Sequence, residues 1–200
     1  MAHTTVARPG SATEIVRDSR FLGFADSVSS AAEALELIES LRQTHPDASH
    51  HCWAYRVDTE MRFSDDGEPG GTAGRPMLEV VLKRDLDRVA VVVVRYFGGT
   101  RLGAGGLVRA YGGTAAKALD LAGKRLVEDR VELTVHVPFP ALDVVHRLFA
   151  ETRGALAGAG EFDVAGCRFD LELPAEEADG FRERLAEITR GAATCEFKTG

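Results

Sequence analysis

Residues 89–94 form an uninterrupted apolar run, VAVVVV, in which five of the six side chains are β-branched. A strand with one face in solvent alternates apolar and polar residues, so a continuous run predicts a strand that is buried on both faces. The run leads into FGGTRLGAGG and then into a helical pattern from about Gly105 to Leu121. The chain is therefore expected to contain a buried strand that passes through a glycine-rich turn into a helix.

The rest of the first 130 residues also shows strand and helix periodicity. Residues 13–16 and 21–27 are predicted to pair as strands. Ser30 and Glu33 form a capping box, and a helix with Ala31, Leu35, Ile38 and Leu41 on one face is expected from there to about residue 44. Residues 51–57 alternate as a half-buried strand. Residues 64–76 form an ordered or mobile loop, and a short helix follows Pro76.

The last seventy residues have their own pattern. Strands are predicted at 131–137 and 193–197, a helix at 141–151, and a hairpin of strands 156–164 and 167–173. Pro174 is expected to open a second helix with Phe181, Leu185 and Ile188 facing inward. The order β-α-β-β-α-β is that of the ferredoxin-like unit. We therefore expect an α+β protein of two domains, residues 1–130 and 131–200.

Composition narrows the protein's class. The chain is 44% hydrophobic, but its longest apolar run is far shorter than the roughly 20 residues that a membrane span needs. The first residues contain no apolar leader segment. The three cysteines are scattered without a CxxC pair, which argues against a disulfide framework. These features predict a cytoplasmic protein without a membrane partner.

The net charge of −7 is distributed unevenly. Residues 1–130 hold 17 Lys and Arg against 18 Asp and Glu, whereas residues 131–200 hold 7 against 13. Within residues 95–125 there are six basic residues and one acidic residue. A local basic stretch in an acidic protein favours a discrete anionic partner, although an ordinary solvated helix face would give the same count.

The segment from Arg95 to Arg109, RYFGGTRLGAGGLVR, carries the densest signal. Its glycines permit positive φ and close approach of a ligand, and a helix start attracts anions. Guanidinium groups bind such anions bidentately. A tight strand-to-helix turn is the alternative explanation of the glycines. The segment matches neither GxGxxG nor a P-loop. The predicted anion or RNA site comprises Arg95, Tyr96, Gly98, Gly99, Arg101, Gly103, Gly105, Gly106 and Arg109.

A second motif, SDDGEPGGTAG, occupies residues 64–74. Asp65, Asp66 and Glu68 offer oxygen ligands for a hard cation or a base for catalysis, but the spacing is not that of an EF-hand. Aspartates also initiate turns and cap helices. A structural or binding loop is therefore favoured over a metal or catalytic site.

The tripeptide His50-His51-Cys52 raises the question of a Cys–His nucleophile. On a strand, His50 and Cys52 share a face while His51 points the other way, and a nucleophile would need the two side chains in contact and a third group that orients them. No second Cys/His pair is present to complete a zinc site. A buried structural thiol is favoured. We therefore assign no catalytic residue, no metal ligand and no cofactor.

Several segments together resemble the IMPACT/YigZ family. They are Ser19-Arg-Phe, HCWAYR at 51–56, SDDGEP at 64–69, GTAG at 71–74, VRYFGG at 94–99 and LGAGGLVRAY at 102–111. The resemblance implies an N-terminal domain similar to the second domain of ribosomal protein S-five. It also implies a ferredoxin-like C-terminal domain similar to one of elongation factor G. Few residues precede the first predicted strand, so the additional N-terminal domain of eukaryotic members is not expected.

The resemblance places one set of residues on the concave face of the N-terminal sheet. To the residues above it adds a loop site comprising Arg56, Asp65, Asp66, Glu68 and Thr72. In an RNA-binding protein the arginines would meet phosphates, and Tyr96 or Phe97 would stack on an unpaired base.

Such a protein would be a non-enzymatic, translation-associated regulatory factor whose partner is RNA or the ribosome. Two alternatives stay open. One is a protein-interaction regulator that binds a protein partner through its acidic C-terminal domain. The other is an enzyme on a small phosphorylated or carboxylated substrate that uses Asp65, Asp66 or Glu68 as acid or base.

Overall fold

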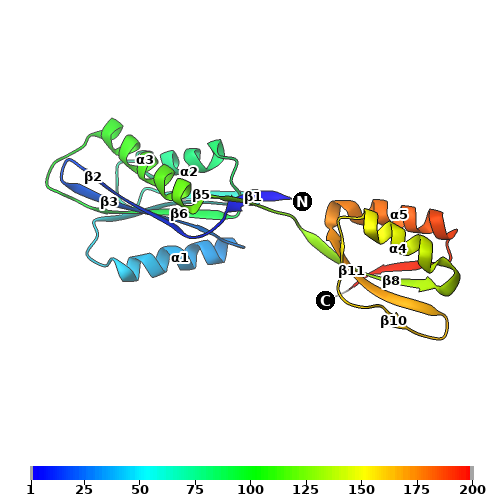
Figure 1. Cartoon of the computed structure of the whole chain (residues 1–200). Coiled ribbons are helices and arrows are strands. Elements are labelled where there is room, and N and C mark those ends of the chain that lie inside the picture. The colour runs from blue at the N-terminus through cyan, green and yellow to red at the C-terminus, as the bar shows by residue number, and fades with distance from the viewer. Residues whose placement is uncertain (1, 199–200) are drawn as a thin grey trace. The chain divides into compact units, whose positions relative to one another are not determined.

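The computed structural model describes residues 2–198 and divides into two compact units (Figure 1). The first unit runs from His3 to Val127, and the second begins at Glu128. The sequence prediction set this boundary after residue 130. Each unit has its own sheet, helices and hydrophobic core.

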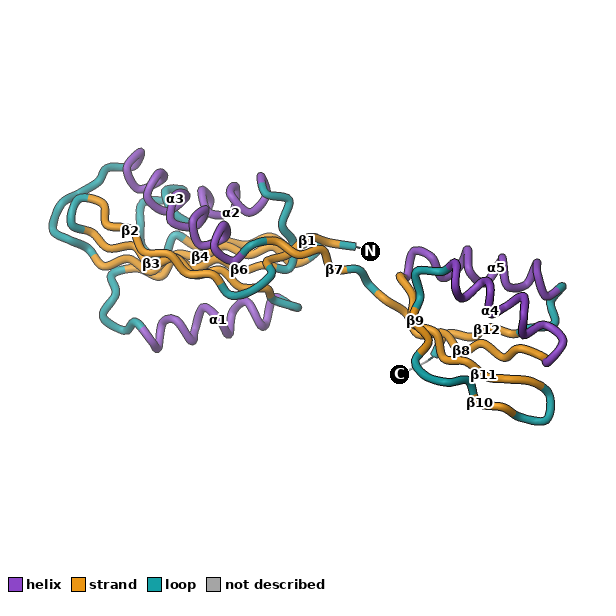
Figure 2. The backbone as a smooth tube through the Cα atoms, viewed as in Figure 1, coloured by secondary structure: helices purple, strands orange, loops and turns teal. Residues whose placement is uncertain are grey.

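The first unit is built on a five-stranded antiparallel sheet in the order β2-β3-β6-β4-β5. The strands are β2 (Gly10–Val16), β3 (Ser19–Ser27), β4 (His50–Val57), β5 (Glu60–Ser64) and β6 (Val89–Tyr96). Helix α1 (Ala31–Thr44) covers one face, and α2 (Gly74–Lys83) and α3 (Ala104–Ala122) cover the other (Figure 2). A separate ribbon pairs β1 (His3–Val6) with β7 (Lys124–Val127).

The central strand β6 is buried on both faces, as its apolar run predicts, because helices cover both sides of the sheet. The prediction of a half-buried strand at 51–57 is wrong. Strand β4 lies between β6 and β5, and its Cys52 and Tyr55 are both fully buried although they point to opposite faces. An occasional polar residue in a central strand therefore does not mark a solvent face.

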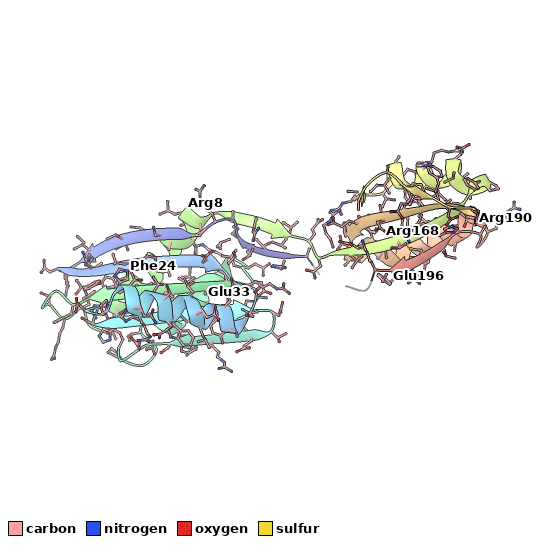
Figure 3. The ribbon with its side chains drawn as sticks, turned by 90° about the horizontal axis from the view of Figure 1, so that it is seen from below. Arg8, Phe24, Glu33, Arg168, Arg190 and Glu196 are labelled. Carbon is pink, nitrogen blue, oxygen red and sulfur yellow. The ribbon has the colours of Figure 1, made fainter. Side chains whose placement is uncertain are left out.

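Helix α1 begins at the predicted cap, where the Ser30 hydroxyl accepts from the Glu33 amide. The Glu33 carboxylate reaches back to the amide of Ser29, one residue earlier than in a standard capping box. Figure 3 looks onto this helix, with Glu33 near its start. The helix buries Ala34, Ile38 and Leu41. Leu35, which was predicted to face inward, is 47% exposed.

The second unit follows the predicted β-α-β-β-α-β order. Its elements are β8 (Arg130–Pro138), α4 (Leu142–Glu151), β9 (Ala155–Leu156), β10 (Glu161–Phe162), β11 (Gly166–Pro174), α5 (Ala178–Thr189) and β12 (Thr194–Phe197), with short 3-10 turns at Phe139–Ala141 and Ala175–Glu177. The sheet order is β10-β11-β8-β12, with β9 paired beside β11. Both helices pack on one face (Figure 1). This arrangement agrees with the predicted α+β class and ferredoxin-like topology.

Two details of the second unit differ from the prediction. The strand expected at 156–164 is broken between β9 and β10, where the sequence AGAG at 157–160 has no large side chain to pack against the sheet. Ile188 is 40% exposed, and Thr189 takes the inward position in the last turn of α5. Among residues 2–198, no helix has an apolar stretch long enough to cross a membrane.

Candidate functional site

The two motifs predicted from sequence meet at the end of the sheet where β6 stops. The loop between β5 and α2 and the turn between β6 and α3 together line a cavity of about 330 Å³. The residues of this cavity that bear on binding are Glu68, Arg95, Phe97, Arg101, Gly103 and Ala104. The fold thus brings an acidic loop, a buried arginine and a helix start to one place.

Arg95 is not the surface cation that the sequence suggested. It lies on the α2/α3 face of β6 and is only 4% exposed. Its Nη1 donates to Oε1 of Glu68 at 2.6 Å, and its Nη2 donates to the Ser19 hydroxyl at 3.2 Å. The guanidinium carbon lies 5.3 Å from the ring centre of Phe21 and 5.4 Å from that of Phe97. Its charge is therefore compensated inside the protein, while its Nε–H finds no acceptor within residues 2–198.

Glu68 is the second member of this buried pair. Besides Arg95, the hydroxyl of Tyr111 on α3 donates to the same Oε1 at 2.6 Å. Tyr111 is fully buried, and burial, reinforced by the neighbouring Cys52 thiol and then by the Glu68 carboxylate, raises the pKa of its hydroxyl far above the ordinary value. The tyrosine therefore stays protonated and serves as a hydrogen-bond donor that holds Glu68 in place.

The other residues of the 64–74 loop hold the loop itself together. Asp65 accepts hydrogen bonds from the amides of Gly71, Ala73 and Gly74, so it also caps the start of α2. The Thr72 side chain is buried and donates to the carbonyl of Pro69. The loop is thus ordered by its own carboxylate and hydroxyl groups.

Asp66 is also committed to structure. It accepts from the His51 amide at 2.6 Å and pairs with Arg42 of α1 at 2.6 Å. Burial alone would raise the pKa of Asp66, but the hydrogen bonds from Arg42 and His51 outweigh it and lower the pKa below its usual value. Neither Asp65 nor Asp66 keeps the freedom that an acid or base in catalysis needs.

The glycines of the second motif have different roles. Gly98 sits against the backbone of Asp18, and a Cβ atom there would lie 2.1 Å from the Asp18 carbonyl. Gly99 and Gly103 have φ angles of 89° and 72°, which side chains rarely adopt. Gly105 and Gly106 lie in the first turn of α3, and a Cβ on Gly105 would meet only the end of the Arg109 side chain. Three glycines therefore shape the turn, and Gly105 leaves the helix start open.

The start of α3 has no side-chain cap. Its N-cap residue is Gly103, and no side chain hydrogen-bonds to the first amides of the helix. Arg101 is exposed beside this point. Free amides, the positive end of the helix dipole and a guanidinium together form an arrangement that attracts anions.

Arg109 does not line this cavity, from which it is separated by Leu102. It lines a smaller hollow of about 190 Å³ together with Arg17 of the β2–β3 turn, and Leu102 lines both hollows. Sequence reasoning missed Arg17, because it lies far from the glycine-rich motif along the chain. Pairing of β2 with β3, and the close approach of Gly98 to this turn, bring it there.

Two predicted site residues lie elsewhere. Arg56 lies at the far end of β4, opposite Val89 at the start of β6, whereas the cavity lies at the end of β6. The Arg56 side chain donates to the carbonyl of Leu86. Tyr96 faces α1 rather than α3, since side chains alternate along β6. Its hydroxyl lies 2.9 Å from Nδ1 of His45. Neither joins the cavity, whereas the exposed Phe97 does.

The structure also tests whether the Cys52 thiol could act as a nucleophile. Cys52 donates to the Asp65 carbonyl at 3.1 Å, and burial raises the pKa of the thiol far above its ordinary value. The His51 ring points to the other face and lies 3.1 Å from the His45 carbonyl oxygen. The His50 ring shares a face with Cys52, but its Nδ1 lies 2.8 Å from the Asp66 carbonyl oxygen. These positions oppose a Cys–His nucleophile. Across the described part of the chain, no three His, Cys, Asp or Glu residues gather in a way that would hold a metal ion.

Comparison with known proteins decides the family. The model of the Impact N-terminal domain matches residues 17–119, a span that contains both motifs of the cavity. The chain belongs to the IMPACT family.

Relatives support this assignment over nearly the whole length. An IMPACT family member in the pol 5' region of Thermus thermophilus is 46% identical over 88% of this chain and 97% of its own length. The IMPACT family member YigZ of Escherichia coli is 34% identical and covers 93% of each chain. A crystal structure described as a hypothetical protein matches with a TM-score of 0.68 at 32% identity, covering 99% of this chain and 98% of the other. Both units are thus common to this chain and its IMPACT relatives.

Proposed function

We propose that this IMPACT family member is a non-enzymatic, translation-associated factor that binds single-stranded RNA, free or within the ribosome, through the start of α3. The observation that carries the proposal is the uncapped first turn of α3 between two exposed arginines, Arg101 and Arg109. The association with translation rests on the family resemblance.

The geometry suits a phosphodiester backbone. Phosphates would lie against the amides after Gly103 and exchange charge-assisted hydrogen bonds with Arg101. Arg109 and Arg17 line the neighbouring hollow together with Glu14, whose carboxylate pairs with Lys117, so the two arginines extend the basic surface beyond Leu102. Phe97 is 49% exposed and offers an aromatic face beside the same cavity. Stacking on aromatic rings beside a basic track is typical of proteins that bind single strands.

The enzymatic alternative has weaker support. Both oxygens of Asp65 accept backbone amides, Asp66 pairs with Arg42, and Glu68 is held by Arg95 and Tyr111. A general acid or base must be free to exchange a proton with its substrate. The acidic side chains of this loop are instead engaged in holding the loop.

The test is fluorescence anisotropy of labelled oligouridine with the full chain at several salt concentrations. Three arginine contacts give an expected slope of log K against log salt of about −2, because each contact to a single strand contributes about −0.7. Arg101→Ala should weaken binding about tenfold, since a hydrogen bond to a charged group contributes about 1.5–3 kcal/mol. It should also make the slope shallower by about 0.7, because one phosphate contact is lost.

Arg125→Ala is the matched control. It removes the same charge from an exposed arginine that follows the far end of α3. At 1.5 Å per residue, that point lies about 28 Å from the start of the helix. Equal losses in Arg101→Ala and Arg125→Ala would indicate nonspecific charge attraction and would refute the site.

A further inference from the structure

The five-stranded sheet of the first unit has an open edge at β5. The strand order β2-β3-β6-β4-β5 gives β5 a single neighbour, β4, among the strands of residues 2–198. An edge strand presents a row of backbone N–H and C=O groups to which a further strand can pair. Every residue of β5 except Ser64 is exposed to solvent. The edge is therefore open to strand addition.

Two apolar side chains lie on this exposed strand. Met61 is 48% exposed and Phe63 is 44% exposed. Phe63 is opposite Ala54, which belongs to the core beneath α2 and α3, so both side chains lie on the face of the sheet that α2 covers. An open edge with exposed apolar side chains is an arrangement that favours association with another strand.

Helix α2 adds to the apolar surface at the edge. Pro76 and Val80 lie on its flank toward α3, since a Cβ atom on Gly112 of α3 would be 3.9 Å from a side-chain carbon of each. Leu78 and Leu82 are one turn apart on the opposite flank, on the side of β5. Leu82 is 40% exposed. Apolar side chains of α2 and β5 thus lie along the same edge.

The other face of β5 carries opposite charges on either side of Met61. Glu60 and Arg62 pair with each other at 3.0 Å, yet their side chains are 44% and 66% exposed. If two copies of β5 pair antiparallel with Met61 opposite Met61, each Glu60 lies opposite the Arg62 of the other copy. Sliding one strand by two residues instead places Arg62 opposite Arg62, or Glu60 opposite Glu60, and like charges directly opposite are unfavourable. The charges therefore make β5 complementary to itself in one register.

We propose that β5 is a dimerisation edge, at which a second copy of this chain adds its own β5 antiparallel in that register. A two-fold axis at Met61, perpendicular to the sheet, continues one sheet through both copies and keeps both α2 helices on the same face. The paired strands are short, so the dimer is weak and its population depends on protein concentration. The contact uses no residue of the cavity beside α3 and is independent of the proposed RNA binding.

The test is sedimentation velocity of the full chain over about a hundredfold range of concentration, in which the sedimentation coefficient should rise toward that of a dimer. Arg62→Glu places carboxylates opposite each other twice, because of the two-fold axis, and should weaken dimerisation about tenfold or more. Met61→Lys places two ammonium groups at the axis and should have a similar effect. Glu36→Arg is the control, since it reverses an exposed charge on α1 and should leave dimerisation unchanged.

A mixing experiment tests the register. Glu60→Arg places Arg opposite Arg62 and should also weaken self-association. When the Glu60→Arg and Arg62→Glu chains are mixed, every opposed pair joins a basic and an acidic side chain, so the mixture should form a heterodimer. A chain that carries both substitutions should dimerise with itself again. Apolar attraction alone would not produce this pattern.

The outcomes decide the proposal. A wild-type chain that stays monomeric over the whole range would overturn it and leave the edge to a strand of a different protein. Dimerisation that is unchanged in Arg62→Glu and Met61→Lys would place the contact elsewhere and would also overturn it. Glu60 accepts a hydrogen bond from the buried Tyr55 hydroxyl, so tryptophan fluorescence must verify that Glu60→Arg folds. If it does not fold, the Arg62→Glu and Met61→Lys measurements decide.

Discussion

The buried pair of Glu68 and Arg95 leads to a quantitative prediction about stability. Both side chains are almost completely removed from solvent and lie 2.6 Å apart. Removing one partner leaves the other charge buried without compensation, which typically costs about 3–5 kcal/mol. Glu68→Leu and Arg95→Met should each destabilise the first unit by this amount. For a unit of about 125 residues, the loss corresponds to a fall of roughly 12–20 °C in Tm.

The double variant should be more stable than either single variant. Replacing a buried ion pair with apolar residues of similar volume is often neutral, because the desolvation cost of both charges disappears. Here the Tyr111 hydroxyl would lose its acceptor, Oε1 of Glu68. An unpaired buried hydroxyl costs about 1–3 kcal/mol, so the double variant should stay below wild type by about that much.

The assay is urea unfolding followed by tryptophan fluorescence. Trp53 on β4 is the single tryptophan, so its signal reports on the first unit alone. Single variants that lose less than about 1 kcal/mol would mean that water reaches the pair. If the double variant loses the sum of the two single losses in free energy of unfolding, the two charges do not compensate each other. Either result would refute the reasoning.

Two further predictions concern the turn and the loop. Gly98→Ala should lower the free energy of unfolding by about 3 kcal/mol or more, because its Cβ would collide with the backbone of Asp18. Gly105→Ala should leave the free energy of unfolding unchanged or raise it by up to about 1 kcal/mol. Urea unfolding of the two variants measures both changes. The pKa of Asp66 is lower in the folded protein than in the unfolded chain. The ionised Asp66 carboxylate therefore stabilises the fold at pH values above its unfolded pKa, and this stabilisation is lost as the pH falls through its folded pKa. Arg42→Ala should therefore flatten the fall in stability below about pH 4, and an unchanged acid limb would contradict this assignment.

The elements that sequence predicts well are those whose pattern follows from burial. The valine-rich β6 and the C-terminal β-α-β-β-α-β order are evident because each element buries a continuous run or a single stripe. The β1–β7 ribbon was not predicted, because two four-residue strands far apart in the chain carry too little periodicity. Helical spacing predicts that Leu35 faces inward, yet α1 buries the neighbouring Ala34 instead.

The candidate site shows a different limit. Sequence located both motifs of the cavity, because dense glycine and clustered carboxylates are unusual in any fold. It could not assign their roles, since Arg95 and Tyr96 are adjacent in sequence but point to opposite faces of β6. Only the register of the sheet determines which one meets Glu68.

That register also explains why a basic-residue count misjudged the surface. Arg95 adds to the positive count of residues 95–125, yet Glu68 cancels its charge within the core. Lys117 is similarly paired with Glu14. The positive surface at the start of α3 comes instead from Arg101 and Arg109, joined by Arg17 of the β2–β3 turn. A ligand at this site would therefore meet two chemically distinct zones. The first zone, Arg101 with the amides at the start of α3, is positively charged, whereas the second, the buried Glu68–Arg95 pair, is neutral.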